Sequence, residues 1–91
     1  MLIRKLEKTG ALQILSHLHQ NGEATRSDLR ANVNAAMETI YTALENLKSL
    51  GLIEETVSNS FPRTVKVHLS EKGVSVAKRI YEIENALQAL E

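Results

Sequence analysis

The chain has 91 residues, of which 43% are hydrophobic and 24% are charged, and these values are ordinary for a single globular domain. Eleven basic and eleven acidic side chains give a formal net charge of zero, so any attraction to nucleic acid must come from a local patch. The chain has no cysteine, which excludes disulfides and thiolate metal sites, and it has no apolar run near the roughly 18 residues of a membrane span, so we expect a cytoplasmic protein without a membrane partner.

The first predicted helix begins at Thr9, which we expect to be its N-cap, and ends at Asn21 before a glycine. Its apolar residues recur at helical spacing and predict one buried stripe made of Ala11, Leu12, Ile14, Leu15 and Leu18. Leu2, Ile3 and Leu6 precede this helix, and apolar side chains at a terminus also need a cover.

The second predicted helix starts at Thr25, because Thr25 to Asp28 resembles a capping box with Asp in place of Glu or Gln. Its buried anchors are Leu29 and Val33. The short segment Glu23-Ala24 before it is a candidate third strand. After the helix, we expect Asn34 to adopt the left-handed conformation that a sharp turn between helices often needs, because asparagine tolerates it best among non-glycine residues.

The third predicted helix spans about Ala36 to Leu50 and ends at Gly51. At 100° per residue, one side collects the apolar residues Ile40, Ala43, Leu44 and Leu47, with Met37 and Leu50 at its edges. The opposite side is polar and consists of Glu38, Thr42, Glu45 and Ser49, flanked by Tyr41 and Asn46. The helix therefore has one face for the core and one for solvent or a partner.

Two predicted strands follow, at residues 52–57 and 64–69, joined by a loop of turn-forming residues that includes Pro62. The second strand alternates, which places Val65, Val67 and Leu69 inward. Ser70 is then expected to cap the final helix. A glycine-terminated helix that runs directly into a hairpin predicts an α+β domain with a three-helix core, a two-stranded hairpin and a C-terminal helix.

The final helix carries apolar residues at alternating spacings of four and three, namely Val76, Ile80, Ile83, Leu87 and Leu90. This pattern is typical of a coiled-coil seam rather than a broad amphipathic face. We interpret it as a dimer interface made by two such helices related by a two-fold axis. The alternative is that the helix packs on the first helix of its own chain.

From Thr25 to Gly73 the chain resembles the MarR-like and ArsR-like winged helix-turn-helix transcriptional regulators. The matching residues are Asp28-Leu29 and Val33, then Ile40, Leu44 and Leu47, then Gly51-Leu52-Ile53-Glu54, and finally Leu69-Ser70-Glu71-Lys72-Gly73. The resemblance implies one winged-helix domain over residues 1–91, with its core at 9–69 and a dimerisation helix at 70–91. It also implies a homodimer whose recognition helices enter the DNA major groove at half-sites roughly 34–36 Å apart.

The resemblance places base contacts on the third helix, at Glu38, Thr39, Tyr41, Thr42 and Asn46. Phosphate contacts are expected from surrounding basic residues, namely Arg26, Arg30, Lys48, Arg63 and Lys66. The alternative for both sets is an ordinary solvated surface with scattered charge. Phe61 in the hairpin loop either stays exposed or folds back onto the hairpin.

Three positions depart from the family pattern. Ala36 stands where Ser or Thr usually caps the recognition helix, and Thr42 stands where a longer polar residue is common. Glu38 and Glu45 face the path of the phosphates. We therefore expect affinity for DNA to come mainly from the surrounding Arg and Lys residues, with the recognition helix adding selectivity.

The leading hypothesis is a homodimeric, sequence-specific regulator that binds double-stranded DNA. The alternative is a winged-helix module for protein–protein interaction, which the neutral charge favours. No catalytic constellation or glycine-rich phosphate loop is apparent, so we expect no enzyme and no cofactor. His17 and His19 point about 160° apart on a helix and His68 lies on an outward strand face, so no metal site is expected. A small-molecule effector is left unspecified.

Overall fold

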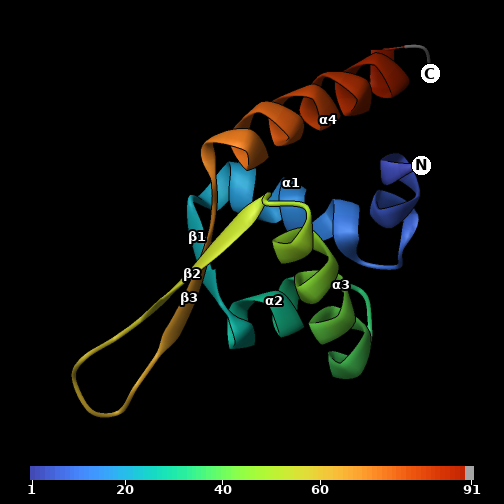
Figure 1. Cartoon of the computed structure of the whole chain (residues 1–91). Coiled ribbons are helices and arrows are strands. Elements are labelled where there is room, and N and C mark those ends of the chain that lie inside the picture. The colour runs from blue at the N-terminus through green and yellow to red at the C-terminus, as the bar shows by residue number, and fades with distance from the viewer. Residues whose placement is uncertain (90–91) are drawn as a thin grey trace.

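The computed structural model describes residues 1–89 and shows the predicted winged helix (Figure 1). The elements in chain order are η1 (Leu2–Glu7), α1 (Ala11–Asn21), β1 (Glu23–Thr25), α2 (Arg26–Asn32), α3 (Met37–Ser49), β2 (Ile53–Val57), β3 (Val65–Leu69) and α4 (Glu71–Ala89). The boundaries of α3, β2 and β3 lie within one residue of those predicted from the sequence. The short η1 is a 3-10 helix that the sequence patterns did not indicate.

The sheet is antiparallel with the order β1-β3-β2, so the candidate strand at Glu23-Ala24 is confirmed. Val67 in the central strand faces Ala24 on one side and Glu55 on the other. The hairpin of β2 and β3 extends away from the helices, and its tip lies far from α4 (Figure 1). We call this hairpin, residues 53–69, the wing.

The core lies where α1, α2 and α3 meet the sheet. Its fully buried large side chains come from all four of these elements and are Ile14, Leu15, Leu18, Leu29, Ile40, Leu47 and Val67. The predicted stripe on α1 is confirmed except for Leu12, which is 46% exposed. Of the three inward residues predicted for β3, only Val67 is fully buried; Val65 and Leu69 are half-buried.

Two predicted local conformations are wrong. The N-cap of α1 is Gly10 in a left-handed conformation with φ 88°, rather than Thr9. Asn34 is not left-handed, since every residue with positive φ within residues 1–89 is a glycine. Val33 and Ala36 are both extended, so the link between α2 and α3 turns over several residues without a left-handed one. The Asn34 backbone N–H donates to Gln13 Oε1 at 3.0 Å, which ties this link to α1.

The predicted capping box of α2 is present. The Asp28 backbone N–H donates to Thr25 Oγ1 at 3.1 Å, and the Thr25 backbone N–H donates to Asp28 Oδ2 at 2.9 Å. Two N–H donors at the start of the helix are thus satisfied by side chains. The backbone and side-chain hydrogen bonds with Thr25 hold the pKa of Asp28 below its usual value.

The first turn of α4 is attached to the end of α3. Ser70 caps α4 as predicted, accepting from the Gly73 backbone N–H at 3.0 Å, and its hydroxyl donates to the carbonyl of Gly51. Lys72 Nζ donates to the Leu50 carbonyl at 2.9 Å. Gly73 is buried, and a β-carbon there would lie only 1.9 Å from the Leu52 carbonyl oxygen. Glycine is therefore required for this close packing of α4 on the segment that follows α3.

The seam predicted for α4 divides into two halves. Val76 and Ile80 pack against the core of the same chain, as the alternative interpretation expected. Ile83 and Leu87 are each 60% exposed, and Leu90 lies outside the described residues. The dimer interface therefore stays a prediction, now concentrated on the second half of the helix. Within residues 1–89 no helix has both the length and the apolar character needed to cross a membrane.

Candidate nucleic-acid interface

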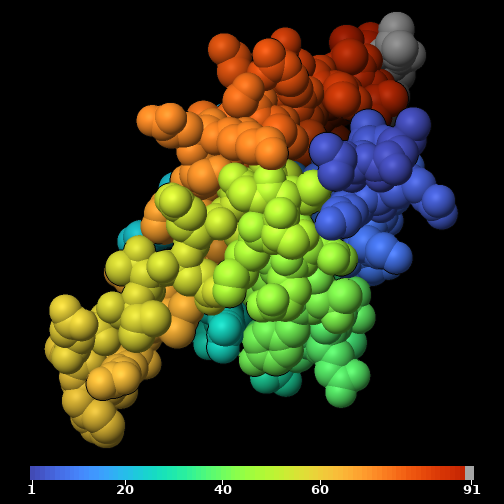
Figure 2. Space-filling model, viewed as in Figure 1, coloured from blue at the N-terminus to red at the C-terminus, as the bar shows by residue number. Residues whose placement is uncertain are grey.

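Helices α2 and α3 and the wing lie at one end of the molecule, while α4 lies across the opposite end (Figures 1 and 2). The polar face of α3 points outward as the sequence indicated. Glu38, Tyr41, Thr42 and Glu45 are exposed, and Thr39 and Asn46 are half-buried. Burial of Ile40, Ala43, Leu44 and Leu47 on the other face fixes this orientation.

The start of α3 has no side-chain cap, because Ala36 occupies the N-cap position. The Thr42 hydroxyl donates back to the Glu38 carbonyl at 3.1 Å, so its donor is already used within the helix. Its oxygen remains able to accept a hydrogen bond. The exposed face of α3 therefore presents mainly acceptors and one aromatic ring.

Arg26, a predicted phosphate contact, is held by two neighbours from different elements. Its Nη2 lies 3.4 Å from Glu55 Oε2 on β2. Its guanidinium carbon lies 5.2 Å from the centre of the Tyr41 ring on α3, within the range of a cation–π contact. The interaction brings two predicted site residues, Arg26 and Tyr41, together and links α2, α3 and the wing.

Glu55 also binds Lys48, which completes a four-residue cluster of ion pairs. Lys48 Nζ contacts Glu55 Oε1 and lies 3.7 Å from Glu45 Oε1. The Lys48 ammonium holds the pKa of Glu55 below its usual value and the Glu55 carboxylate raises the pKa of Lys48, so both groups are charged at neutral pH. Two cations and two carboxylates leave this cluster with no net charge.

The remaining predicted phosphate contacts differ in their pairing. Lys66 Nζ lies 3.3 Å from Glu23 Oε1, which neutralises it in part. Arg30 and Arg63 make no ion pair with any group of residues 1–89. A hollow of about 400 Å³ separates the start of α2 from the wing, and its lining includes Arg26, Ser27 and Arg63. Two guanidinium groups and neighbouring hydroxyls suit it to a phosphate group.

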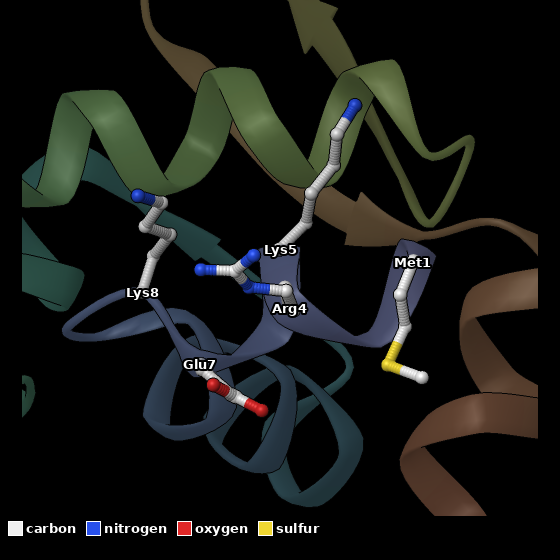
Figure 3. A pocket seen from close by; sticks show the side chains of 5 residues that line it. All are labelled: Met1, Arg4, Lys5, Glu7 and Lys8. Carbon is white, nitrogen blue, oxygen red and sulfur yellow. The ribbon is translucent and has the colours of Figure 1, made fainter.

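A basic residue absent from the sequence prediction lies on the other side of α3. Lys8 and Thr9 line a hollow of about 210 Å³ together with Thr39 and Thr42 of the polar face. Lys8 belongs to a group of cations on and beside η1 that includes Arg4 and Lys5 and surrounds a further hollow of about 480 Å³ (Figure 3). Three cations within five residues were visible in the sequence, but only the fold places them beside α3.

The wing tip carries an exposed aromatic ring. Phe61 is 96% exposed, which decides between the two interpretations of this residue: it does not fold back onto the hairpin. Arg63 is exposed in the same loop. The loop is closed by a hydrogen bond of 2.8 Å from the Ser58 backbone N–H to the Thr64 carbonyl.

The histidines have structural partners of their own. His17 lies beside Asn21, the His19 ring lies next to the Tyr81 ring at an angle of 45° to it, and His68 Nε2 lies 3.3 Å from Glu54 Oε1. The described part of the chain holds no group of three or more His, Cys, Asp or Glu side chains arranged to bind a metal ion.

Comparisons with known proteins agree with this architecture. The HxlR-like helix-turn-helix family matches residues 5–90. The chain is 33% identical over 78 residues to the HTH-type transcriptional regulator YwhA of Bacillus subtilis (strain 168), a match that covers 86% of this chain and 55% of the relative. The chain thus spans about half the length of this curated relative.

Two solved structures show the same fold. A MarR family transcriptional regulator from Silicibacter pomeroyi DSS superposes with a TM-score of 0.80 at 28% identity, covering 94% of this chain and 57% of that one. The protein ytfH of Salmonella typhimurium, assigned as a transcriptional regulator, superposes with a TM-score of 0.82 at 18% identity, covering 96% and 78%.

The family and the curated relative are transcriptional regulators rather than enzymes, in agreement with the expectation that the chain is not an enzyme. The resemblance of residues 25–73 to winged helix-turn-helix regulators is confirmed. The matching family is the HxlR-like one, and its match extends over residues 5–90. The chain belongs to the HxlR-like helix-turn-helix family of transcriptional regulators.

Proposed function

We propose that the protein binds double-stranded DNA as a homodimer, with α3 in the major groove and the wing on the backbone or minor groove. The observation that supports this most directly is the placement of the polar face of α3 between two hollows that hold basic residues, Lys8 on one side and Arg26 with Arg63 on the other. Phosphates flank the major groove on both sides, so a helix with basic residues on both sides suits insertion into that groove. The site of action would be the cytoplasm.

Base contacts in this proposal come from Glu38, Thr39, Tyr41, Thr42 and Asn46. Glutamate accepts from cytosine N4, and asparagine bonds adenine through both its groups. Asn46 is half-buried, so it reaches a base only where α3 lies deep in the groove. Backbone contacts come from Arg26, Arg30, Arg63 and Lys66.

The proposed dimer uses the second half of α4. Ile83 and Leu87 lie one turn apart on the same face of α4 and are each 60% exposed, so two large aliphatic side chains form an apolar patch on the surface. Pairing this face with its copy removes both residues from water. It would also leave α3 free, because α4 lies at the opposite end of the molecule (Figure 1).

Fluorescence anisotropy of a labelled random duplex, at 50 mM and 200 mM salt, tests DNA binding. We expect binding at low salt that weakens by orders of magnitude as salt rises. Arg63→Ala should weaken it, whereas Arg79→Ala removes the same charge from α4, where Arg79 bonds Ser75, and should leave it unchanged. No binding at 50 mM salt by an intact dimer would overturn the proposal.

Mass measurement at micromolar concentration tests the dimer. We expect twice the chain mass of 10.1 kDa for the unmodified protein and a single chain for Ile83→Asp. Val74→Asp is the matched control, since Val74 is also exposed on α4 but lies outside the seam. A single chain for the unmodified protein would contradict the dimer.

A protein–protein interaction module is the second candidate. The ion pairs of Arg26, Lys48 and Lys66 favour it, because they neutralise three of the five basic residues that the sequence predicts to contact phosphates. This candidate predicts a partner that binds with little dependence on salt. It also predicts that Arg63→Ala together with Lys66→Ala has no effect on nucleic-acid binding.

A further inference from the structure

Glu55 is the least exposed charged group at the proposed DNA-binding end among those that form ion pairs. Its side chain is 17% exposed, compared with 46% for Arg26 and 41% for Lys48, the two cations it contacts. It lies on β2 at the base of the wing, between α2 and the C-terminal end of α3. One carboxylate thus holds two cations, Arg26 and Lys48, that the sequence predicts to contact phosphates.

The two contacts of Glu55 differ in strength. Lys48 Nζ contacts one carboxylate oxygen closely, whereas Arg26 reaches the other oxygen through a single nitrogen at 3.4 Å. An arginine held through both its terminal nitrogens would be bound more firmly. Arg26 is also half in solvent and lines the hollow that it shares with Arg63. It is therefore placed between an internal carboxylate and a site that suits a phosphate.

We propose that the Glu55 carboxylate competes with DNA phosphates for Arg26 and Lys48 and thereby limits sequence-independent binding. A phosphate that enters the hollow beside Arg63 shares the Arg26 guanidinium with Glu55 or draws it away from that carboxylate. The negative charge of Glu55 also opposes any phosphate that approaches Lys48. Since backbone contacts supply most non-specific affinity, this carboxylate raises the share of binding that base contacts on α3 must provide. The inference rests on the proposed function.

The experiment compares Glu55→Gln with Glu54→Gln in the full chain on the random duplex. Both variants remove one negative charge from β2, but Glu54 is 64% exposed and contacts His68 rather than a cation of the interface. We expect Glu55→Gln to bind about tenfold tighter at 50 mM salt, and its slope of log affinity against log salt to steepen by about one per protomer. Glu54→Gln should show neither change.

A second comparison tests whether Glu55 competes with DNA for Arg26 or positions Arg26 for DNA. If Glu55 competes, Arg26→Ala costs more affinity in the Glu55→Gln background than in the unmodified protein, because the released guanidinium is then available to DNA. A smaller cost in that background would mean that Glu55 positions Arg26 for DNA, and it would overturn the inference. Thermal melting verifies folding, and Glu55→Asp, which retracts the carboxylate by one methylene, replaces Glu55→Gln if the latter unfolds.

The outcomes for the two proposals are distinguishable. If the unmodified dimer does not bind DNA at 50 mM salt, the proposed function fails. If it binds and Glu55→Gln behaves as Glu54→Gln does, only the role of Glu55 fails.

Discussion

Helices α3 and α4 are both amphipathic, yet the chain completes the packing of only one of them. On α3, the apolar face is buried from Ile40 to Leu47. On α4, burial stops after the first half: Gly73 and Ala77 are buried, whereas Ile83 and Leu87 stand 60% exposed. The difference shows that α3 is positioned by its own core, while the apolar side chains in the second half of α4 are left uncovered by residues 1–89.

This comparison also separates the two parts of the proposed function, which are DNA contact by α3 and dimerisation through α4. The outward orientation of the polar face of α3 follows from buried contacts within one chain, so it does not require a dimer. Spacing two such helices along DNA does require one. The first turn of α4 is attached to the segment directly after α3, through Lys72 at Leu50 and Gly73 at Leu52.

Truncation of the buried face of α3 should have the largest effect. We expect Leu47→Ala to lower the free energy of unfolding by about 2–5 kcal/mol, because a fully buried leucine leaves a cavity. Leu87→Ala should change the unfolding of the isolated chain by less than about 0.5 kcal/mol and act on the dimer, so its effect should depend on protein concentration. Urea denaturation at two protein concentrations measures both. If both variants lowered the free energy of unfolding equally, and independently of protein concentration, α3 and α4 would not differ in how they are packed.

Substitution at the junction should come next. Gly73→Ala places a methyl group against the Leu52 carbonyl, and the required shift should cost about 1–3 kcal/mol. Ser75→Ala, an exposed position on the same helix, is the control. If Gly73→Ala leaves the melting temperature unchanged, α4 is not seated as closely on Leu52 as the structure shows.

Adding the missing cap to α3 should have a smaller and opposite effect. Ala36 has the extended backbone of an N-cap, with φ −66° and ψ 154°, but no side-chain acceptor. Ala36→Ser should raise stability by about 1 kcal/mol, and calorimetry would detect the increase in melting temperature. A decrease would mean that the serine hydroxyl does not reach the first N–H groups of α3.

The pH dependence should be the smallest effect. Hydrogen bonds from Thr25 lower the pKa of Asp28 in the folded state, and Lys48 lowers that of Glu55. Stability from these carboxylates is therefore complete above their unfolded pKa values, about 3.9 for Asp and 4.3 for Glu, and is lost as the pH falls through the lower folded values. Melting temperatures between pH 7 and pH 3 should fall less steeply for Asp28→Asn than for the unmodified protein.

Much of the fold could be predicted because its signals are local. The capping box at Thr25, the apolar spacing of α3 and the alternation of β3 each involve neighbours in sequence. The first two were found in the structure, and the third in part, since only Val67 of β3 is fully buried. The two errors were also local, since Thr9 and Asn34 are plausible cap and turn residues. In the structure Gly10 is the N-cap of α1, and the link at Asn34 has no left-handed residue and is bonded to Gln13. Contacts of α1 with that link decided the conformation.

The sequence predicted which residues of α3 lie on its outward face, but it did not predict which charged residues around α3 form ion pairs. Periodicity alone assigned the outward face of α3, because burial of one side of a helix exposes the other. No pattern in the sequence indicated that Arg26 and Lys48, residues 22 apart, share the carboxylate of Glu55, or that Lys8 lies beside Thr39. Ion pairs between distant segments depend on how elements pack, so only the tertiary structure shows which cations around α3 are neutralised and which are available to a phosphate.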